Sequence, residues 1–250
     1  MTTFITATSN TATTSPHPGD SLLPHGTGQH VKVDVWADIA CPWCYLGKRR
    51  LDEAAASFSA DREQGERTVD IEVHSFELAP DLPEGRTQSM MDYQMNHQGV
   101  SAGDAVDALE RMTRLGRRVG ITYDFDGMQV TNSARAHQLM HYAKARGRQL
   151  DAEEALFAAY FTHGRNLGDI SVLGDIADEL GLDRADAIRA LTANEQLSAF
   201  RADTELARTL GITAVPFLIV DGKYAVAGVR SAKVIEDALE RAWSERQDVA

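Results

Sequence analysis

The two cysteines of this 250-residue chain lie in the stretch "DIACPWCYLG", as Cys41 and Cys44. A spacing of one helical turn brings two sulfurs within reach of a disulfide bond. Strand-like residues precede the pair and helix-favouring residues follow it, so the motif occupies a predicted strand-to-helix junction. Two thiols at such a junction are typical of a dithiol–disulfide redox couple.

The position in the junction predicts different roles for the two thiols. Cys41 is expected at the N-cap and Pro42 at the first helical position, where a missing N–H costs nothing. Free N–H groups and the positive end of the helix dipole then favour Cys41 as a solvent-accessible, nucleophilic thiolate. Cys44, one turn further in and partly covered, is placed to attack a mixed disulfide on Cys41 and release the substrate.

Two other interpretations of the cysteine pair compete with a redox couple. A structural zinc site needs four ligands, and the chain has neither a second CxxC nor histidines at finger spacing. His137 and His141 lie four residues apart, but "HQLMH" lacks the glutamate of a zinc-protease helix. We therefore expect no metal and no cofactor. The alternative of two buried small hydrophobic side chains stays open.

The residue pattern on either side of the cysteine pair predicts the strands and helices that position it. "VKVDVWA" alternates like a strand, the helix after the cysteines has an apolar face, and "TVDIEVHSFEL" alternates again. Near the C-terminus, "VPFLIV" and "KYAVAG" flank the turn signal Asp221-Gly222, and Ser231 is expected to cap a last helix. The pattern predicts one sheet built from β-α-β and β-β-α segments.

Residues 88–210 have a helical texture with glycine stop signals and predict five or six helices. Asn132 or Ser133 is expected to cap one of them and Asp151 another. The pattern predicts an α/β fold in which one sheet domain is interrupted by an all-helical insertion. We expect a flexible tail over 1–30, the first part of the sheet domain over 31–85, the helical insertion over 86–205 and the second part of the sheet domain over 206–250.

Composition excludes some classes of partner. A formal charge of −12 would repel phosphate backbones and anionic lipid headgroups. No apolar stretch approaches the roughly 20 residues that span a bilayer. The first thirty residues contain neither Lys nor Arg and no continuous apolar core, so they do not predict a secretory signal. We therefore expect a cytoplasmic protein that binds neither nucleic acid nor membrane.

Five stretches, which together cover nearly everything after the tail, are "DIACPWCYLGKRRLDEA", "FELAPDLPEG", "TNSARAHQLMHYAKARG", "LFAAYFTHGRNLGD" and "ELARTLGITAVPFLIVDGKYAVAG". In these stretches the sequence resembles the FrnE-like branch of the DsbA family of thioredoxin-fold proteins. The resemblance implies an α/β, thioredoxin-like fold with an inserted all-helical subdomain, in which the two parts of the sheet domain form the thioredoxin-like domain. It also implies a thiol–disulfide oxidoreductase or isomerase. Its partner would be a disulfide- or thiol-bearing polypeptide or a small thiol; the oligomeric state is left open.

The resemblance also implies a second part of the site. The family carries a cis-proline opposite the cysteines, and Pro216 in "TAVPF" matches it. In the family, the residue before this proline, here Val215, pairs through its backbone with an extended polypeptide. Pro42 and Trp43, between the cysteines, would shape the active site.

Two positions depart from related proteins. Strongly oxidising relatives carry His where this chain has Trp43, so Cys41 should be less acidified here. Many thioredoxin-fold proteins carry a buried carboxylate six positions before the first cysteine, where this chain has Val35. Asp34 and Asp38 flank that position, and strand alternation predicts that they face solvent or cap the turn.

Two rival functions also fit the sequence. Glutathione-dependent isomerases of small aromatic carboxylates share the superfamily, but they typically have Ser in place of the first cysteine and lack the second. The other rival is a chaperone-like binder of unfolded polypeptides. A holdase assay with both cysteines replaced would separate such a binder from an enzyme.

Overall fold

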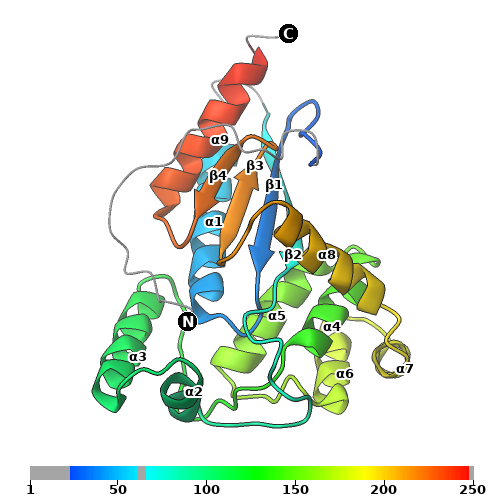
Figure 1. Ribbon diagram of the computed structural model, residues 1–250. Helices are drawn as coiled ribbons and strands as arrows, with labels where there is room; N and C mark the ends of the chain where they lie inside the picture. Colours follow the sequence, from blue (N-terminus) through cyan, green and yellow to red (C-terminus); the bar gives the residue numbers. More distant parts are fainter. Residues whose placement is uncertain (1–22, 61–65, 248–250) are drawn as a thin grey trace. The chain divides into compact units, whose positions relative to one another are not determined.

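The computed structural model describes residues 23–60 and 66–247 (Figure 1). Their contacts divide into two compact units. The sheet unit consists of residues 23–60, 66–76 and 202–247, and the helical unit of Glu77–Arg201. The divisions fall at 76/77 and 201/202, before the expected ones at 85 and 205. One reason is that Asn132 Nδ2 of the helical unit donates to Glu77 Oε1 and to the carbonyl of Leu82, both at 3.1 Å.

The sheet unit contains four strands in the order β2-β1-β3-β4. The strands are β1 His30–Ala37, β2 Thr68–Ser75, β3 Phe217–Val220 and β4 Tyr224–Ala227. β1 and β2 are parallel, with Val35 opposite Val73, whereas β3 is antiparallel to both β1 and β4. With helices α1 Pro42–Ala60 and α9 Ala232–Gln247, this is the expected β-α-β and β-β-α arrangement.

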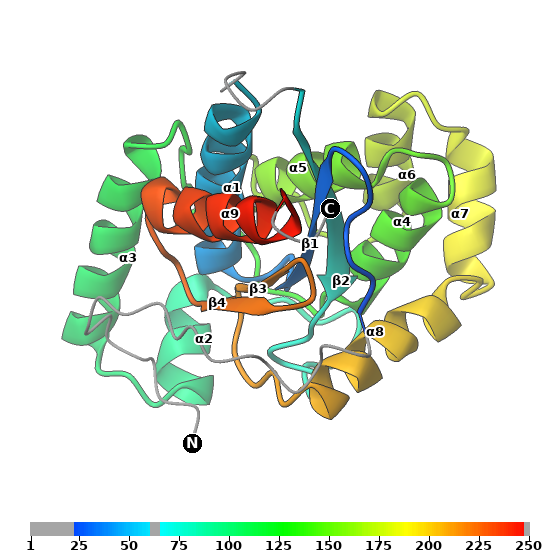
Figure 2. The same cartoon turned by 90° about the horizontal axis from the view of Figure 1, so that it is seen from above.

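Strand β1 lies inside the sheet and is covered on both faces. Seven of its eight residues are buried. Helices α1 and α9 lie side by side on one face (Figure 2). On the other face, Trp36 and Ile219 join a buried cluster with Ala207, Leu210 and Ile212, which belong to the end of α8 and the segment after it. Helix α8 therefore supplies the second cover of the central strand.

The helical segment contains more helices than expected. Residues 66–247 are all described, and seven helices lie between β2 and β3 rather than five or six. They are α2 Met90–His97, α3 Ala102–Arg117, α4 Ala134–Lys144, α5 Gln149–Phe161, α6 Ile170–Glu179, α7 Arg184–Thr192 and α8 Leu197–Thr209. The division between α7 and α8 carries no glycine or proline signal. Asn194 adopts a left-handed φ of 53° there, which non-glycine residues other than Asn and Asp seldom do.

Cap predictions were confirmed in part. Asn132 Oδ1 accepts from the N–H of Ala134 at the start of α4, and Ser231 Oγ accepts from Val234 N–H at the start of α9. The Asp151 prediction was wrong, because α5 begins two residues earlier, at Gln149, and leaves Asp151 in its first turn. Among the described residues, no helix combines the length and apolar character needed to cross a bilayer.

The segment before β1 makes contacts that its composition did not suggest. Leu23 is buried in the cluster around Trp36. The N–H of Gly26 donates to Asp221 Oδ1 at 2.8 Å, and Arg246 Nε donates to Asp221 Oδ2 at 2.8 Å. Residues 23–29 are thus joined to the β3–β4 turn, whereas residues 1–22 of the expected tail lie outside the described residues.

Candidate active site

The cysteine pair occupies the start of α1 as the sequence predicted. The helix begins at Pro42, directly after Cys41. The N–H of Cys44 donates to the carbonyl of Cys41 at 3.0 Å, which closes the first turn. Asp38 prepares this turn, because its Oδ1 accepts from Ala40 N–H and its carbonyl accepts from Cys41 N–H at 3.0 Å. Asp38 is 1% exposed and thus does not face solvent; its side chain closes the turn that precedes α1.

The two thiols do not differ in exposure as expected. Cys41 is 3% exposed and Cys44 2%, and both are free thiols in this structure. Burial raises the pKa of Cys44 well above its usual value, and a hydrogen bond with the Cys41 side chain adds to the increase. Cys44 is therefore held as a protonated thiol beside its partner. The hydrogen bond and the position at the helix start, rather than accessibility, distinguish the two sulfurs.

Pro216 lies against the same helix. The Val215–Pro216 peptide bond is cis. The Pro216 ring lies beside Gly47, three residues after Cys44, since a Cβ placed on Gly47 would be 2.9 Å from Pro216 Cγ. The carbonyl of Pro216 accepts from Gly228 N–H at 2.9 Å. Pro216 is thereby placed next to the cysteine helix.

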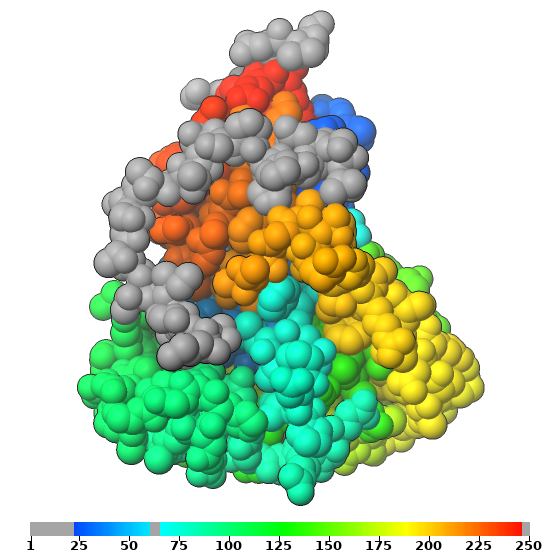
Figure 3. All heavy atoms as spheres, in the orientation of Figure 1, coloured from blue at the N-terminus to red at the C-terminus, as the bar shows by residue number. Residues whose placement is uncertain are grey.

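The segment before Pro216 is open to solvent. Thr213 and Ala214 are exposed and Val215 is half-buried. Figure 3 shows orange atoms, which are those of α8 and the segments after it, at the surface of this face of the molecule. No described residue forms a hydrogen bond with the backbone of Val215. Pro42 and Trp43 are also half-buried. The sheet unit thus contains all six residues that the sequence analysis assigned to the site.

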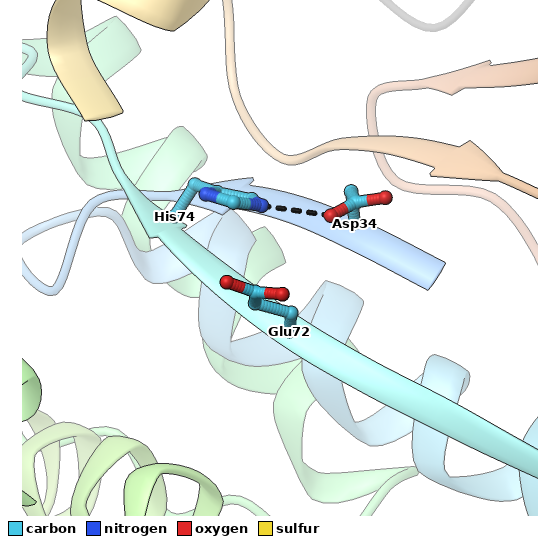
Figure 4. A group of neighbouring side chains, drawn as sticks. All are labelled: Asp34, Glu72 and His74. Atoms are coloured by element: carbon cyan, nitrogen blue, oxygen red, sulfur yellow. Dashed lines mark hydrogen bonds and ion pairs between the residues drawn. The ribbon is translucent and has the colours of Figure 1, made fainter. Parts of the chain in front are cut away.

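The sheet unit also contains a buried ionic network that the sequence did not predict, and Figure 4 shows its His74–Asp34 pair. His74 Nε2 lies 2.8 Å from Asp34 Oδ1, and its Nδ1 lies 3.1 Å from Asp203 Oδ1 of α8. The N–H of Ser75 also donates to Asp203 Oδ2, at 2.8 Å. Burial lowers the pKa of His74, but the hydrogen bonds to Asp203 and Asp34 outweigh this and raise it to about 9. His74 is an imidazolium at neutral pH, shared by two carboxylates.

The prediction that Asp34 faces solvent was wrong, since Asp34 is 1% exposed. The alternation along β1 is real, but α8 covers the face that was assigned to solvent. That face is opposite the one on which α1 lies (Figure 2). Asp34 is therefore not placed as a proton shuttle for the cysteines. The charged residues that alternate along β2 (Asp70, Glu72 and His74) were the signal for this network, whereas nothing in the sequence pointed to Asp203.

Asp34, Glu72 and His74 also have the composition of a metal-ligand set, with donor atoms within 4.8 Å of one another. These donors already have protein partners. Lys32 Nζ lies 2.8 Å from Glu72 Oε2, and both nitrogens of His74 contact carboxylates. Asp34 Oδ2 is buried and has no hydrogen-bond partner among the described atoms. We describe the group as an ion-pair network in which two cations balance the acids.

His137 and His141 of α4 are both buried in the helical unit. The His137 ring is stacked on Phe200, with centroids 5.6 Å apart. Within residues 23–60 and 66–247, neither histidine belongs to a group of three candidate metal ligands. Their spacing is accounted for by packing.

Known proteins share this architecture. A family model described as a DSBA-like thioredoxin domain matches residues 32–240. A probable DsbA oxidoreductase from Streptomyces coelicolor is 32% identical, with a TM-score of 0.79 over 86% of this chain and 91% of that one.

Two further structures are alike in fold. A 2-hydroxychromene-2-carboxylate isomerase is 19% identical, with a TM-score of 0.64 over 88% of this chain and 99% of that one. The cytosolic disulfide reductase DsbM from Pseudomonas aeruginosa is 20% identical, with a TM-score of 0.59 over 88% and 100% of the two chains. The matched model spans most of the chain, which therefore belongs to the DSBA-like thioredoxin domain family, with a thioredoxin-like fold and the enzyme class of a thiol–disulfide oxidoreductase.

Proposed function

We propose that this oxidoreductase cycles Cys41 and Cys44 between dithiol and disulfide, through a mixed disulfide on Cys41. The observation that carries the proposal is the arrangement at the start of α1. Cys41 is at the helix entrance, where N–H groups and the dipole stabilise a thiolate. Cys44 is hydrogen-bonded to it and keeps its proton until the second step.

In one direction of the cycle, the enzyme begins as a dithiol. The Cys41 thiolate attacks one sulfur of a substrate disulfide, forms a Cys41–substrate disulfide and releases the other substrate sulfur as a thiolate. Cys44 then loses its proton and attacks the Cys41 sulfur, which releases the second substrate thiolate. The substrate gains two electrons and the enzyme becomes a disulfide, which an external thiol reduces. Starting from the disulfide, the same steps in reverse oxidise a dithiol.

Val215 supports a polypeptide as substrate. Its backbone N–H and C=O, unpaired among the described residues, are available to hydrogen-bond to an extended chain. A small thiol remains the second candidate. The structures alike in fold include a reductase and an isomerase, so the fold does not choose the direction of the reaction. The FrnE-like branch and the cytoplasmic location stay predictions, the latter in keeping with the cytosolic DsbM.

Trapping the mixed disulfide tests the assignment of roles. Reduced Cys44→Ser protein, mixed with a peptide disulfide, should accumulate one adduct on Cys41, identified by mass spectrometry without reductant. Cys41→Ser should form almost none. Equal adduct formation by both variants would refute the roles. Undiminished activity of the double variant on disulfides would refute cysteine chemistry altogether.

A further inference from the structure

Helix α1 contains a glycine at a place where helices favour other residues. Gly47 is buried in the second turn of α1, three residues after Cys44. Glycine is among the poorest helix formers, whereas alanine is the best. On local grounds alanine would stabilise this turn, so the reason for glycine has to lie in what surrounds it.

The neighbour of Gly47 is the Pro216 ring. A Cβ at position 47 would lie 2.9 Å from Pro216 Cγ and 3.3 Å from Pro216 Cβ. Carbon atoms in favourable contact are about 3.5–4.0 Å apart. An alanine therefore requires α1 and Pro216 to separate by several tenths of an ångström.

Contacts with other residues hold both Pro216 and helix α1 in place. The carbonyl of Pro216 is hydrogen-bonded to Gly228, and the next residue, Phe217, is paired with Trp36 of the central strand. On the helix side, Leu46 and Leu51 are buried in the core. A side chain at position 47 would thus strain the contact between α1 and Pro216, because each of them is fixed by its own contacts with the rest of the sheet unit.

We infer that Gly47 is a positioning residue that sets the spacing between the cysteine helix and the Val215–Pro216 segment. The inference rests on the proposed function, in which Cys41 attacks a substrate whose backbone pairs with Val215. The absence of a side chain at position 47 brings the two halves of that site together. An extended peptide that uses both halves depends on this spacing, whereas a small disulfide that needs only Cys41 does not.

Two disulfide substrates that release the same thiolate distinguish a reaction that depends on the spacing from one that needs only Cys41. Reduced protein is mixed with 5,5′-dithiobis(2-nitrobenzoic acid), or with a ten-residue peptide whose single cysteine carries the same nitrothiobenzoate, and release of the coloured thiolate is followed. Gly47→Ala should lower the rate with the peptide by roughly tenfold or more, since misplacement of reacting groups is costly. The rate with the small disulfide should stay within about twofold of the unmodified protein.

The control is Gly103→Ala in α3, because a Cβ at that helical glycine meets no atom within 4 Å. It should leave both rates unchanged. Equal losses on both disulfides, or no loss on the peptide, would overturn the positioning inference. Retention of both rates in Cys41→Ser would instead refute the proposed function, whatever the result for Gly47.

If Gly47→Ala does not fold, the same contact is tested by stability. Pro216→Ala removes the Cγ that lies 2.9 Å from the added methyl group. Gly47→Ala should then lower the urea midpoint less in the Pro216→Ala background than in the unmodified protein, or fold only in that background. An equal decrease in both backgrounds, or failure to fold in both, would overturn the inference.

Discussion

Replacing His74 by Gln should destabilise the protein most at slightly acid pH and least near pH 9. His74 is 6% exposed and lies between Asp34 and Asp203, which the neutral amide cannot balance. The loss of the imidazolium leaves two buried carboxylates without the cation that both of them contact. Such uncompensated buried charge is strongly destabilising.

The pKa of His74 sets the size of this loss of stability. Burial lowers this pKa, but the bonds to Asp203 and Asp34 raise it from the usual 6.5 to about 9. At about 1.4 kcal/mol per pH unit, this interval corresponds to about 3 kcal/mol of stabilisation. Because the folded-state pKa is the higher one, the stabilisation is complete below about pH 6.5 and is lost as the pH rises through 9. It should be about 3 kcal/mol near pH 6 and less than about 0.5 kcal/mol at pH 9.

Urea unfolding at pH 6.0, 7.5 and 9.0 measures this directly. The difference in unfolding free energy between the unmodified protein and His74→Gln should shrink across the series by about 3 kcal/mol. His163→Gln, a change at an exposed histidine, controls for the general effect of pH and should parallel the unmodified protein. Burial raises the pKa of Cys44 above its ordinary value of 9.0, so this thiol lowers stability as the pH approaches 9, but it does so in both proteins and cancels in the difference. A difference that is the same at all three pH values would refute the shared imidazolium.

Two further predictions concern single side chains. Trp43→His should raise the reduction potential of the cysteine couple, because an imidazolium beside Cys41 stabilises the thiolate of the reduced form. Equilibration with glutathione buffers measures this potential. An unchanged potential would show that position 43 does not tune the site. Glu240→Ala should lower the unfolding free energy by about 3 kcal/mol in urea titrations, because the buried guanidinium of Arg67 loses the carboxylate that it is paired with. As a control, Glu110→Ala at the exposed pair on α3 should lower it by less than about 0.5 kcal/mol. A loss at Glu240 no larger than that at Glu110 would contradict the value assigned to the buried pair.

Local patterns predicted the elements around the cysteines well, because those elements depend on nearby residues. The alternation before Cys41 became β1, and Pro42 begins α1 as expected. The Asp221-Gly222 turn adopts the positive φ angles, 53° and 66°, that its residue types allow. The extra helix boundary at Asn194 was missed, since asparagine ends a helix less regularly than glycine does.

The environment of Asp34 depended on distant residues. Alternation in β1 says which residues share a face but not which faces become covered. Here α8, which follows about 160 residues later in the sequence, closes the second face and brings Asp203 to His74. A polar residue that the strand pattern assigned to solvent thereby became one end of a buried charge network.

The class of enzyme could be predicted from the cysteine pair at a strand-to-helix junction, because one turn of helix is enough to set the spacing of the two thiols. The α/β class of the fold could be predicted as well, through periodicities that are local. Only the folded chain shows which faces are buried, that both thiols are covered, and that Gly47 meets the ring of Pro216. These features arise where segments distant in sequence pack together, and their distances cannot be read from either segment alone.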